Sequence, residues 1–269
     1  MSVNIQIVTV VNDFAQYDRY VKNNPFYKNC DLISFDNTKE NISIPVRYNN
    51  FIDNRMLPDT WVIFCHQDFS MKEDVGLKLK DLDKGCIYGA VGIKDCRWRE
   101  VAFRVTGPNA FRFEKRGFFE RIQYGRILQG VDDDESKAIL MGEKVTRPYE
   151  VDTVDSCCLI LHASLIRKHA LRFDARFDFN LFAADLSIMA RKRYDVRTKI
   201  LQLDCFHLSQ GRRTAGYFRC LSHLIEKHPD EKIALTFSDA EEVAAFKYVL
   251  LNKNSAEIIK GFAGSKEVP

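Results

Sequence analysis

The chain has 269 residues, a length that suits one large α/β domain or one domain with a short appendage. Hydrophobic residues make up 46% of it and charged residues 29%, the composition of an ordinary globular protein. Lysine and arginine number 40 against 37 aspartate and glutamate residues, a net charge of +3. A general role in binding nucleic acid therefore gains no support.

The sequence carries no signal for export or membrane insertion. Its eight cysteines include no C-x-x-C pair, and several stand in apolar runs, where a free cysteine behaves as a small hydrophobe. The first residues, MSVNIQIVTVVND, lack the basic stretch and long apolar core of a signal peptide. No run of about 18 apolar residues predicts a spanning helix. We expect a reduced, cytoplasmic location, with contact at the inner face of a membrane left open.

The first part of the chain predicts alternating strands and helices. Strands are predicted at 3–11 (VNIQIVTVV), 31–35 (DLISF) and 61–65 (WVIFC), which are short apolar runs followed by polar residues. Helices are predicted over 14–24 and 47–56, between these strands. Strands separated by helices over this length predict parallel βαβ units.

The middle of the chain changes character. A further strand is predicted at 86–92 (CIYGAVG), whereas residues 94–150 are rich in arginine, lysine, glycine and aromatic residues. We interpret residues 94–150 as an insertion with β-hairpin and loop structure. Basic and aromatic residues mix over 97–126, which leaves peripheral contact with anionic lipid or glycan open.

Regular patterning returns after the insertion. A strand is predicted at 151–161, a helix at 182–193 with apolar residues on one face, and a strand that ends at His207. The predicted fold class is α/β: a mixed, mainly parallel, Rossmann-like sheet flanked by helices in residues 1–211. A mostly helical C-terminal extension is expected over residues 212–269.

Two potential metal ligands stand at the ends of apolar strands. Asp68 follows WVIFC in the run HQDF, and His207 ends the run CFH. Ligands of open α/β sheets gather beyond the carboxyl ends of the strands. A carboxylate with an imidazole suits Mn²⁺ or Mg²⁺, and the imidazole favours Mn²⁺. For Asp68 the alternative is a plain turn aspartate.

Arg212 lies in a segment that suits a loop over a diphosphate, because arginine pairs with phosphate oxygens.

Asp185 is a candidate general base. It stands at the start of the predicted helix 182–193, where a carboxylate can accept a proton if it reaches the attacking hydroxyl. The same position suits a carboxylate that only stabilises the helix N-terminus. The local sequence does not decide between these two roles.

The order of these segments resembles bacterial glycosyltransferases with the GT-A fold, of the family-2-like superfamily. The branch with His-Gln-Asp in place of the Asp-x-Asp motif is the most similar. The resemblance covers roughly residues 3–211. It is carried by seven runs in order: VTVVND, SFDNT, YNNFID, FCHQDF, VDTVDSCCLIL, the pair RFDARF and AADLSIMARKR, and HLSQG.

The resemblance implies transfer of a sugar from a nucleotide diphosphate sugar, first of all a UDP-sugar, to a hydroxyl of a glycan or lipid-linked acceptor. Inversion and a role in bacterial surface polysaccharide synthesis are implied with it. Asp68 and His207 would hold Mn²⁺ or Mg²⁺, which neutralises the departing diphosphate. Asp155 would lie near the donor sugar or the acceptor. The expected contacts of the nucleotide sugar are Val11, Asn12, Asp36, Asn49, Arg55, His66 and Arg212.

One position departs from the family pattern. Many such enzymes begin the catalytic helix with an acidic pair whose aspartate is the base, whereas this chain has Ala183 at that place. Asp185 comes two residues later and points elsewhere on a helix. Three hypotheses stay open: Asp185 is the base, Asp155 is the base, or catalysis is weak.

Two other functions stay open as well. A non-catalytic nucleotide-sugar-binding or scaffold domain would account for Ala183 and would bind metal and donor without turnover. A sugar nucleotidyltransferase would need a glycine-rich loop with lysine or arginine after the first strand. Residues 9–24 contain no glycine, which disfavours that hypothesis.

Overall fold

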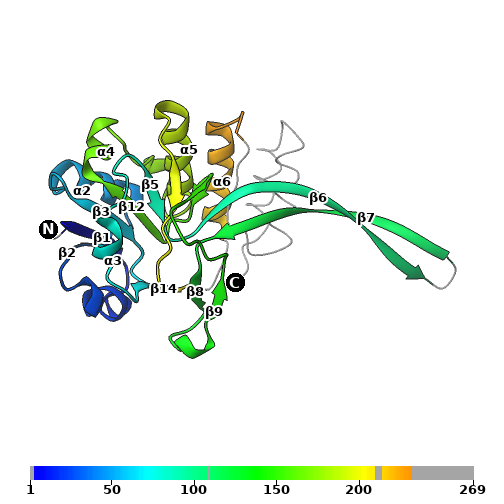
Figure 1. The fold of residues 1–269 in the computed structure, drawn as a ribbon, viewed down its shortest axis with the longest axis horizontal. Helices are drawn as coiled ribbons and strands as arrows, with labels where there is room; N and C mark the ends of the chain where they lie inside the picture. Colours follow the sequence, from blue (N-terminus) through cyan, green and yellow to red (C-terminus); the bar gives the residue numbers. More distant parts are fainter. Residues whose placement is uncertain (1–2, 108–109, 210–213, 232–269) are drawn as a thin grey trace.

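The computed structural model describes residues 3–107, 110–209 and 214–231, and a seven-stranded sheet lies at its centre (Figure 1). The strand order is β10-β13-β5-β12-β3-β1-β2. The strands are β1 (Ile5–Val11), β2 (Asp31–Asp36), β3 (Trp61–Cys65), β5 (Ile87–Gly89), β10 (Tyr149–Val151), β12 (Cys158–His162) and β13 (Thr198–Ile200).

The predicted mixed α/β sheet is confirmed, although fewer of its neighbouring strands are parallel than expected. β2, β1 and β3 run parallel, as do β13 and β5. β12 runs antiparallel to both of its neighbours, and β10 runs antiparallel to β13. Parallel pairs are therefore half of the neighbouring pairs rather than most of them, because the chain re-enters the sheet at β12 from the opposite end.

The interior strand β3 is buried on both faces of the sheet. Its side chains alternate between two hydrophobic clusters: Val62 and Phe64 belong to one, and Trp61, Ile63 and Cys65 to the other. A strand that is covered on both faces reads as a continuous apolar run, which is why WVIFC shows no polar alternation.

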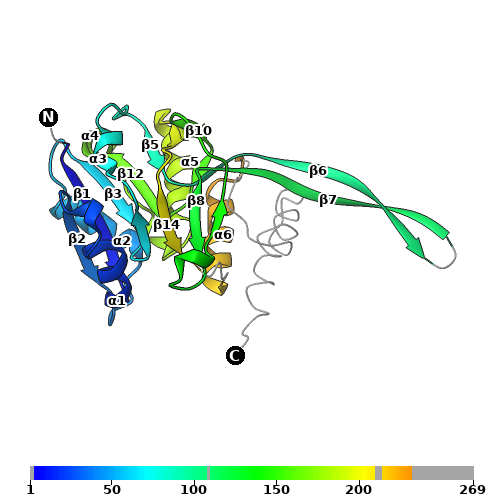
Figure 2. The ribbon, with the colours of Figure 1, turned by 60° about the horizontal axis from the view of Figure 1, so that its bottom comes forward.

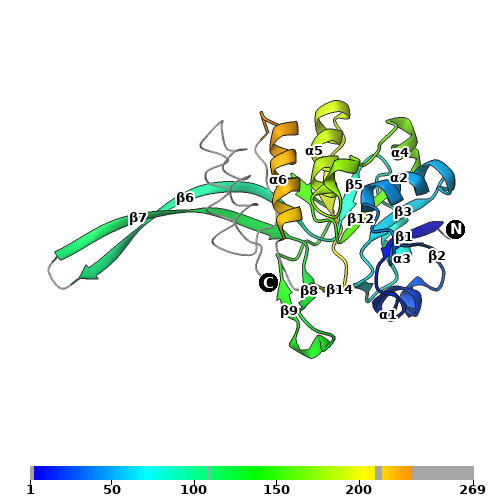
Figure 3. The ribbon, with the colours of Figure 1, turned by 180° about the vertical axis from the view of Figure 1, so that it is seen from behind.

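Helices cover both faces of the sheet. Helices α2, α4, α5 and α6 lie along one side, where they pack against the cluster that contains Val62 and Phe64 (Figure 3). The region of α1 and α3 belongs to the other cluster. No helix in the described ranges is both long and apolar enough to cross a bilayer. The helices are α1 (Phe14–Tyr17), α2 (Ile44–Asn54), α3 (Val75–Leu79), α4 (Ala163–Lys168), α5 (Phe182–Tyr194) and α6 (Ala215–Lys227), with short helical turns η1 (Asp18–Lys22), η2 (Pro25–Tyr27), η3 (Glu135–Lys137) and η4 (Ala175–Phe177).

A second sheet of four strands stands beside the first, in the order β4-β14-β8-β9. β14 runs antiparallel to β4 and parallel to β8. This sheet brings the predicted strand that ends at His207 next to the segment that follows β3. Its strands are β4 (Phe69–Met71), β8 (Ile127–Gly130), β9 (Ile139–Met141) and β14 (Cys205–Leu208).

The predicted β-hairpin content of residues 94–150 is confirmed in two long strands, β6 (Gly92–Gly107) and β7 (Ala110–Tyr124). They pair antiparallel and extend away from the body of the molecule (Figure 2). The short strand β11 (Thr153–Val154) pairs with the base of β6. Gly125 ends β7 at φ +90°, and a Cβ there would overlap the carbonyl oxygen of Ala90.

The described part of the expected C-terminal extension is helical, since α6 begins shortly after β14. Residues 232–269 lie outside the described ranges. The division of the chain at residue 211 stays a prediction.

Candidate functional site

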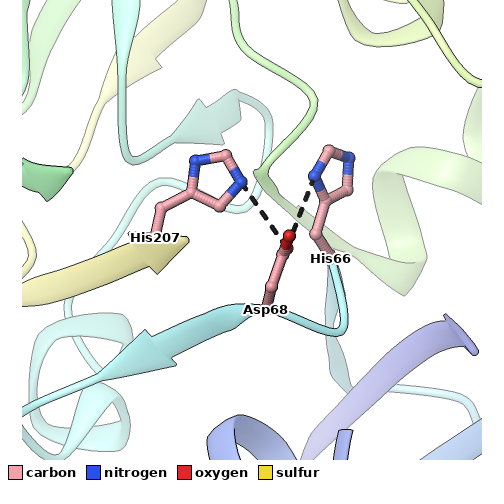
Figure 4. A group of neighbouring side chains, drawn as sticks. All are labelled: His66, Asp68 and His207. Atoms are coloured by element: carbon pink, nitrogen blue, oxygen red, sulfur yellow. Dashed lines mark ion pairs between the residues drawn. The ribbon is translucent and has the colours of Figure 1, made fainter. Parts of the chain in front are cut away.

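Three potential metal ligands meet where β3 and β14 end. His66 and Asp68 lie in the turn between β3 and β4, and His207 lies on β14. Both imidazole rings face the carboxylate of Asp68 (Figure 4). The Nε2 atom of His207 is 3.6 Å from Oδ1 of Asp68, and Nδ1 of His66 is 4.0 Å from the same oxygen. One ligand atom from each residue lies within 4.8 Å of the other two, a spacing that one cation can bridge.

Backbone pairing creates this cluster. The amide of Phe69 donates to the carbonyl of His66 at 3.2 Å, which closes the turn after β3. Phe69 is in register with His207, and the amide of Leu208 donates to the carbonyl of Asp68 at 3.0 Å. Pairing of β4 with β14 therefore brings together side chains that are far apart in the sequence.

The electrostatics of the cluster favour a cation. Burial lowers the pKa of His207, while the Asp68 carboxylate opposes that shift, so the imidazole is neutral, the form that binds metals. Within the described part of the chain, the buried atoms Asp68 Oδ1 and His66 Nε2 have no hydrogen-bond partner. Such atoms are costly unless an ion or water satisfies them. Two imidazoles and one carboxylate suit Mn²⁺ or another transition metal better than Mg²⁺, which prefers oxygen ligands.

A cleft of about 180 Å³ adjoins the cluster at the carboxyl ends of β1 and β3. One part of its lining is polar and another is apolar, as in sites that orient a ligand by a few polar groups. The lining residues are Val10, Asn12, Asn37, Ile44, Tyr48, Cys65, His66, Gln67, Asp68 and Phe179.

The structure places the expected nucleotide-sugar contacts in different ways. Asn12 and His66 line the cleft, and His66 also joins the metal cluster, a role that the sequence did not assign to it. Val11 is fully buried in the core, and its neighbour Val10 lines the cleft instead. The carboxylate of Asp36 is exposed and accepts hydrogen bonds from the amide and hydroxyl of Thr38, which lower the pKa of Asp36.

Two other expected contacts lie elsewhere. The Asn49 side chain exchanges two hydrogen bonds with the backbone of Phe173, at 2.8 and 2.9 Å, so its amide holds α2 to that segment. The Arg55 guanidinium lies over the ring of Phe35, 5.7 Å from its centre. Neither Asn49 nor Arg55 lines the cleft. Arg212 lies outside the described residues.

Seven residues of the cleft lining were not among the site residues assigned from the sequence: Val10, Asn37, Ile44, Tyr48, Cys65, Gln67 and Phe179. Asn37 directly follows Asp36 in the quoted run SFDNT, without a separate assignment. Its backbone amide donates to the Val11 carbonyl at 2.7 Å. Tyr48 lay within the quoted run YNNFID without a separate assignment. Nothing in the local sequence around Phe179 indicated a ligand-facing position.

The two candidate bases differ in their surroundings. Asp155 lies near the cluster: its Oδ1 accepts from the amide of Cys157 at 2.9 Å, and the Cys157 carbonyl accepts from the amide of His66 at 3.1 Å. Asp185 is buried on α5 and accepts hydrogen bonds from Lys227 and His228 at 2.8 Å each. The register of α5 thus turns the Asp185 carboxylate toward the end of α6, and Asp185 is not part of the cleft lining.

Fold and site together define an α/β protein with a candidate divalent-cation centre beside a small cleft. No family model and no curated protein matches the chain.

Several solved structures are similar in outline. GalNAc-T7 with UDP, GalNAc and Mn²⁺ has a TM-score of 0.48 and 10% identity, over 98% of this chain and 58% of that one. TarS 1–349 from S. aureus in complex with UDP has a TM-score of 0.46 and 8% identity, over 99% of this chain and 76% of that one. HddC from Yersinia pseudotuberculosis has a TM-score of 0.31 and 11% identity, over 84% of this chain and 79% of that one. The chain thus spans 58% of the length of GalNAc-T7. Since every one of these TM-scores is below 0.5, the likenesses carry no argument about activity.

Proposed function

We propose that this chain is a metal-dependent glycosyltransferase of the GT-A type, which moves a sugar from a nucleotide diphosphate sugar to a hydroxyl acceptor. The observation that carries the proposal is the cluster of His66, Asp68 and His207, which lies beside a cleft at the carboxyl ends of the strands. Nucleotide ligands of α/β proteins bind at this edge of the sheet. The order of the sequence motifs supports UDP as the first nucleotide to test.

In this mechanism His66, Asp68 and His207 hold the divalent cation, Mn²⁺ in the first place. When bound, the cation supplies Lewis-acid stabilisation of the charge on the leaving diphosphate. Asn12, Asp36 at the end of β2 and Asn37 directly after it bind the nucleoside. The apolar side chains in the cleft exclude water from the donor.

Asp155 is the better candidate for the general base. It accepts from the amide of Cys157, whose carbonyl in turn accepts from the amide of His66 in the cluster, and a base must lie within reach of the attacking hydroxyl. Asp185 would have to give up its contacts with Lys227 and His228 before it could accept a proton from an acceptor. We further propose that the transfer inverts the configuration at the anomeric carbon of the sugar. The acceptor is a glycan or a lipid-linked molecule, and the reaction belongs to bacterial surface polysaccharide synthesis.

The buried position of Asp185 also favours a second hypothesis. If Asp155 does not serve as the base, the chain binds metal and nucleotide sugar without transferring the sugar. Turnover of a bound donor, followed as release of the free nucleoside diphosphate, separates the two hypotheses.

Calorimetric titration with UDP, GDP and CDP, with and without Mn²⁺, tests the proposal. We expect metal-dependent binding of one nucleotide that is lost in Asp68→Ala and in His207→Ala. Asp81→Ala, at an exposed carboxylate, and His169→Ala serve as matched controls and should bind as the unchanged protein does. Well-folded protein that binds none of the three nucleotides would rule the proposal out.

A further inference from the structure

Gln67 stands between two candidate metal ligands, yet its side chain faces away from them. Its Oε1 atom accepts hydrogen bonds from the backbone amides of Asn12 at 2.8 Å and Asp13 at 3.1 Å. Its Nε2 atom donates to Oδ1 of Asn12 at 2.6 Å and to Oε1 of Gln16 at 3.2 Å. One amide group thus makes three contacts with the loop that joins β1 to α1 and a fourth with Gln16 on α1.

This loop forms part of the cleft, because Asn12 belongs to the lining. On one side the loop is fixed by the carbonyl of Val11, which accepts from the amide of Asn37 on the segment after β2. On the other side it is fixed by Gln67. Asp13 then caps α1, with its Oδ1 accepting from the amides of Ala15 and Gln16. The Gln67 amide is therefore the side-chain link between the loop and the metal-binding turn.

Only a carboxamide can make this set of contacts. Its oxygen accepts two backbone N–H groups while its nitrogen donates to two side-chain oxygens. A glutamate would lose both donors and add a negative charge beside Asp68. A methionine of similar length would lose donors and acceptors alike.

We infer that Gln67 is a positioning residue that holds the β1–α1 loop in a fixed relation to the metal-binding turn. Through it, a cation on His66 and Asp68 and a nucleoside against Asn12 favour each other's binding, since coupling between two sites acts in both directions. The coupling to ligands rests on the proposed function. The positioning of the loop does not.

Amide hydrogen exchange of the metal-free protein tests the positioning. In Gln67→Met we expect the Asn12 and Asp13 amides to exchange about tenfold faster, as loss of a hydrogen bond implies. The matched control is Gln202→Met, because the Gln202 side chain clamps the amides of Arg126 and Val145 in the same way, at 3.2 Å each. Gln202→Met should leave Asn12 and Asp13 unchanged. Equal exchange in Gln67→Met and the unchanged protein would overturn the inference.

Binding measurements then test the coupling. Gln67→Met should bind Mn²⁺ alone within about twofold of the unchanged protein, and should bind UDP in saturating Mn²⁺ about tenfold more weakly. Equal losses for Mn²⁺ and UDP, or no loss for either, would overturn the coupling. If the unchanged protein binds no nucleotide, the proposed function fails, while hydrogen exchange still decides whether Gln67 positions the loop.

Discussion

The Nε2 atom of His228 lies 2.8 Å from Oδ1 of Asp185, and Lys227 donates to the second oxygen of the same carboxylate at the same distance. Lys227 also contacts Asp174, at 2.9 Å. These contacts join the start of α5 to the end of α6 and to the segment before η4. The carboxylate that the sequence predicted as a candidate base therefore holds α6 against α5.

Asp185→Asn should destabilise the fold by about 3 kcal/mol, because it removes the charge that balances the largely buried ammonium of Lys227. Urea denaturation measures the effect. Asp195→Asn, at the other end of the same helix, is a matched control with an expected change within about 0.5 kcal/mol. If Asp185→Asn kept full stability and lost only sugar transfer, Asp185 would be a catalytic residue after all.

His66→Ala should weaken Mn²⁺ binding by at least about tenfold. Loss of an outer-shell partner already costs about that much, and His66 is placed as a direct ligand. Titration of the nucleotide-free protein with Mn²⁺ measures the affinity, with His169→Ala as control. Unchanged affinity in His66→Ala would reduce the centre to Asp68 and His207, the pair that the sequence predicted.

The strand ends could be predicted from the sequence because a buried strand is an unbroken apolar run. Asp68 and His207 were therefore predicted at strand ends, and the structure brings their side chains to 3.6 Å. The direction of β12 could not be predicted, because its apolar run reads alike in parallel and antiparallel pairing. His66 was not predicted as part of the metal cluster for a similar reason. Nothing in the local sequence shows that the His66 side chain faces the cluster while the Gln67 side chain faces away from it.

The orientation of Asp185 was not predictable for a related reason. The sequence predicted one apolar face for this helix, whereas the first two turns of α5 are buried nearly all round, Asp185 included. The partners of Asp185 lie on α6, far along the chain, and only the tertiary structure brings them to α5. A helical pattern gives the positions on a helix; it does not give the neighbour that each position meets.

Asp178→Gly should raise stability by about 1 kcal/mol. Asp178 has φ 41° and ψ −98°, a conformation that costs an L-residue about 1–3 kcal/mol and glycine little. The next residue, Phe179, lines the cleft, so this strain lies beside the candidate site. Urea denaturation is again the measurement. Asp204→Gly, outside the positive-φ positions, should instead lose about 0.5 kcal/mol, and a loss in both variants would contradict the assignment of strain.

Acid should weaken the fold through Asp174. Hydrogen bonds from Arg176, together with Lys227, hold the pKa of Asp174 well below its usual range, although burial opposes the shift. A depressed pKa gives stability that is complete above the unfolded value of about 3.9 and is lost as the pH falls toward the folded value. The free energy of unfolding should therefore fall as the pH drops below about 4, and less steeply in Asp174→Asn. Urea denaturation at several pH values measures both slopes. Equal slopes would show that protonation of Asp174 does not cause the loss of stability in acid, whereas a shallower slope in Asp174→Asn assigns that loss to Asp174 and its contacts with Arg176 and Lys227.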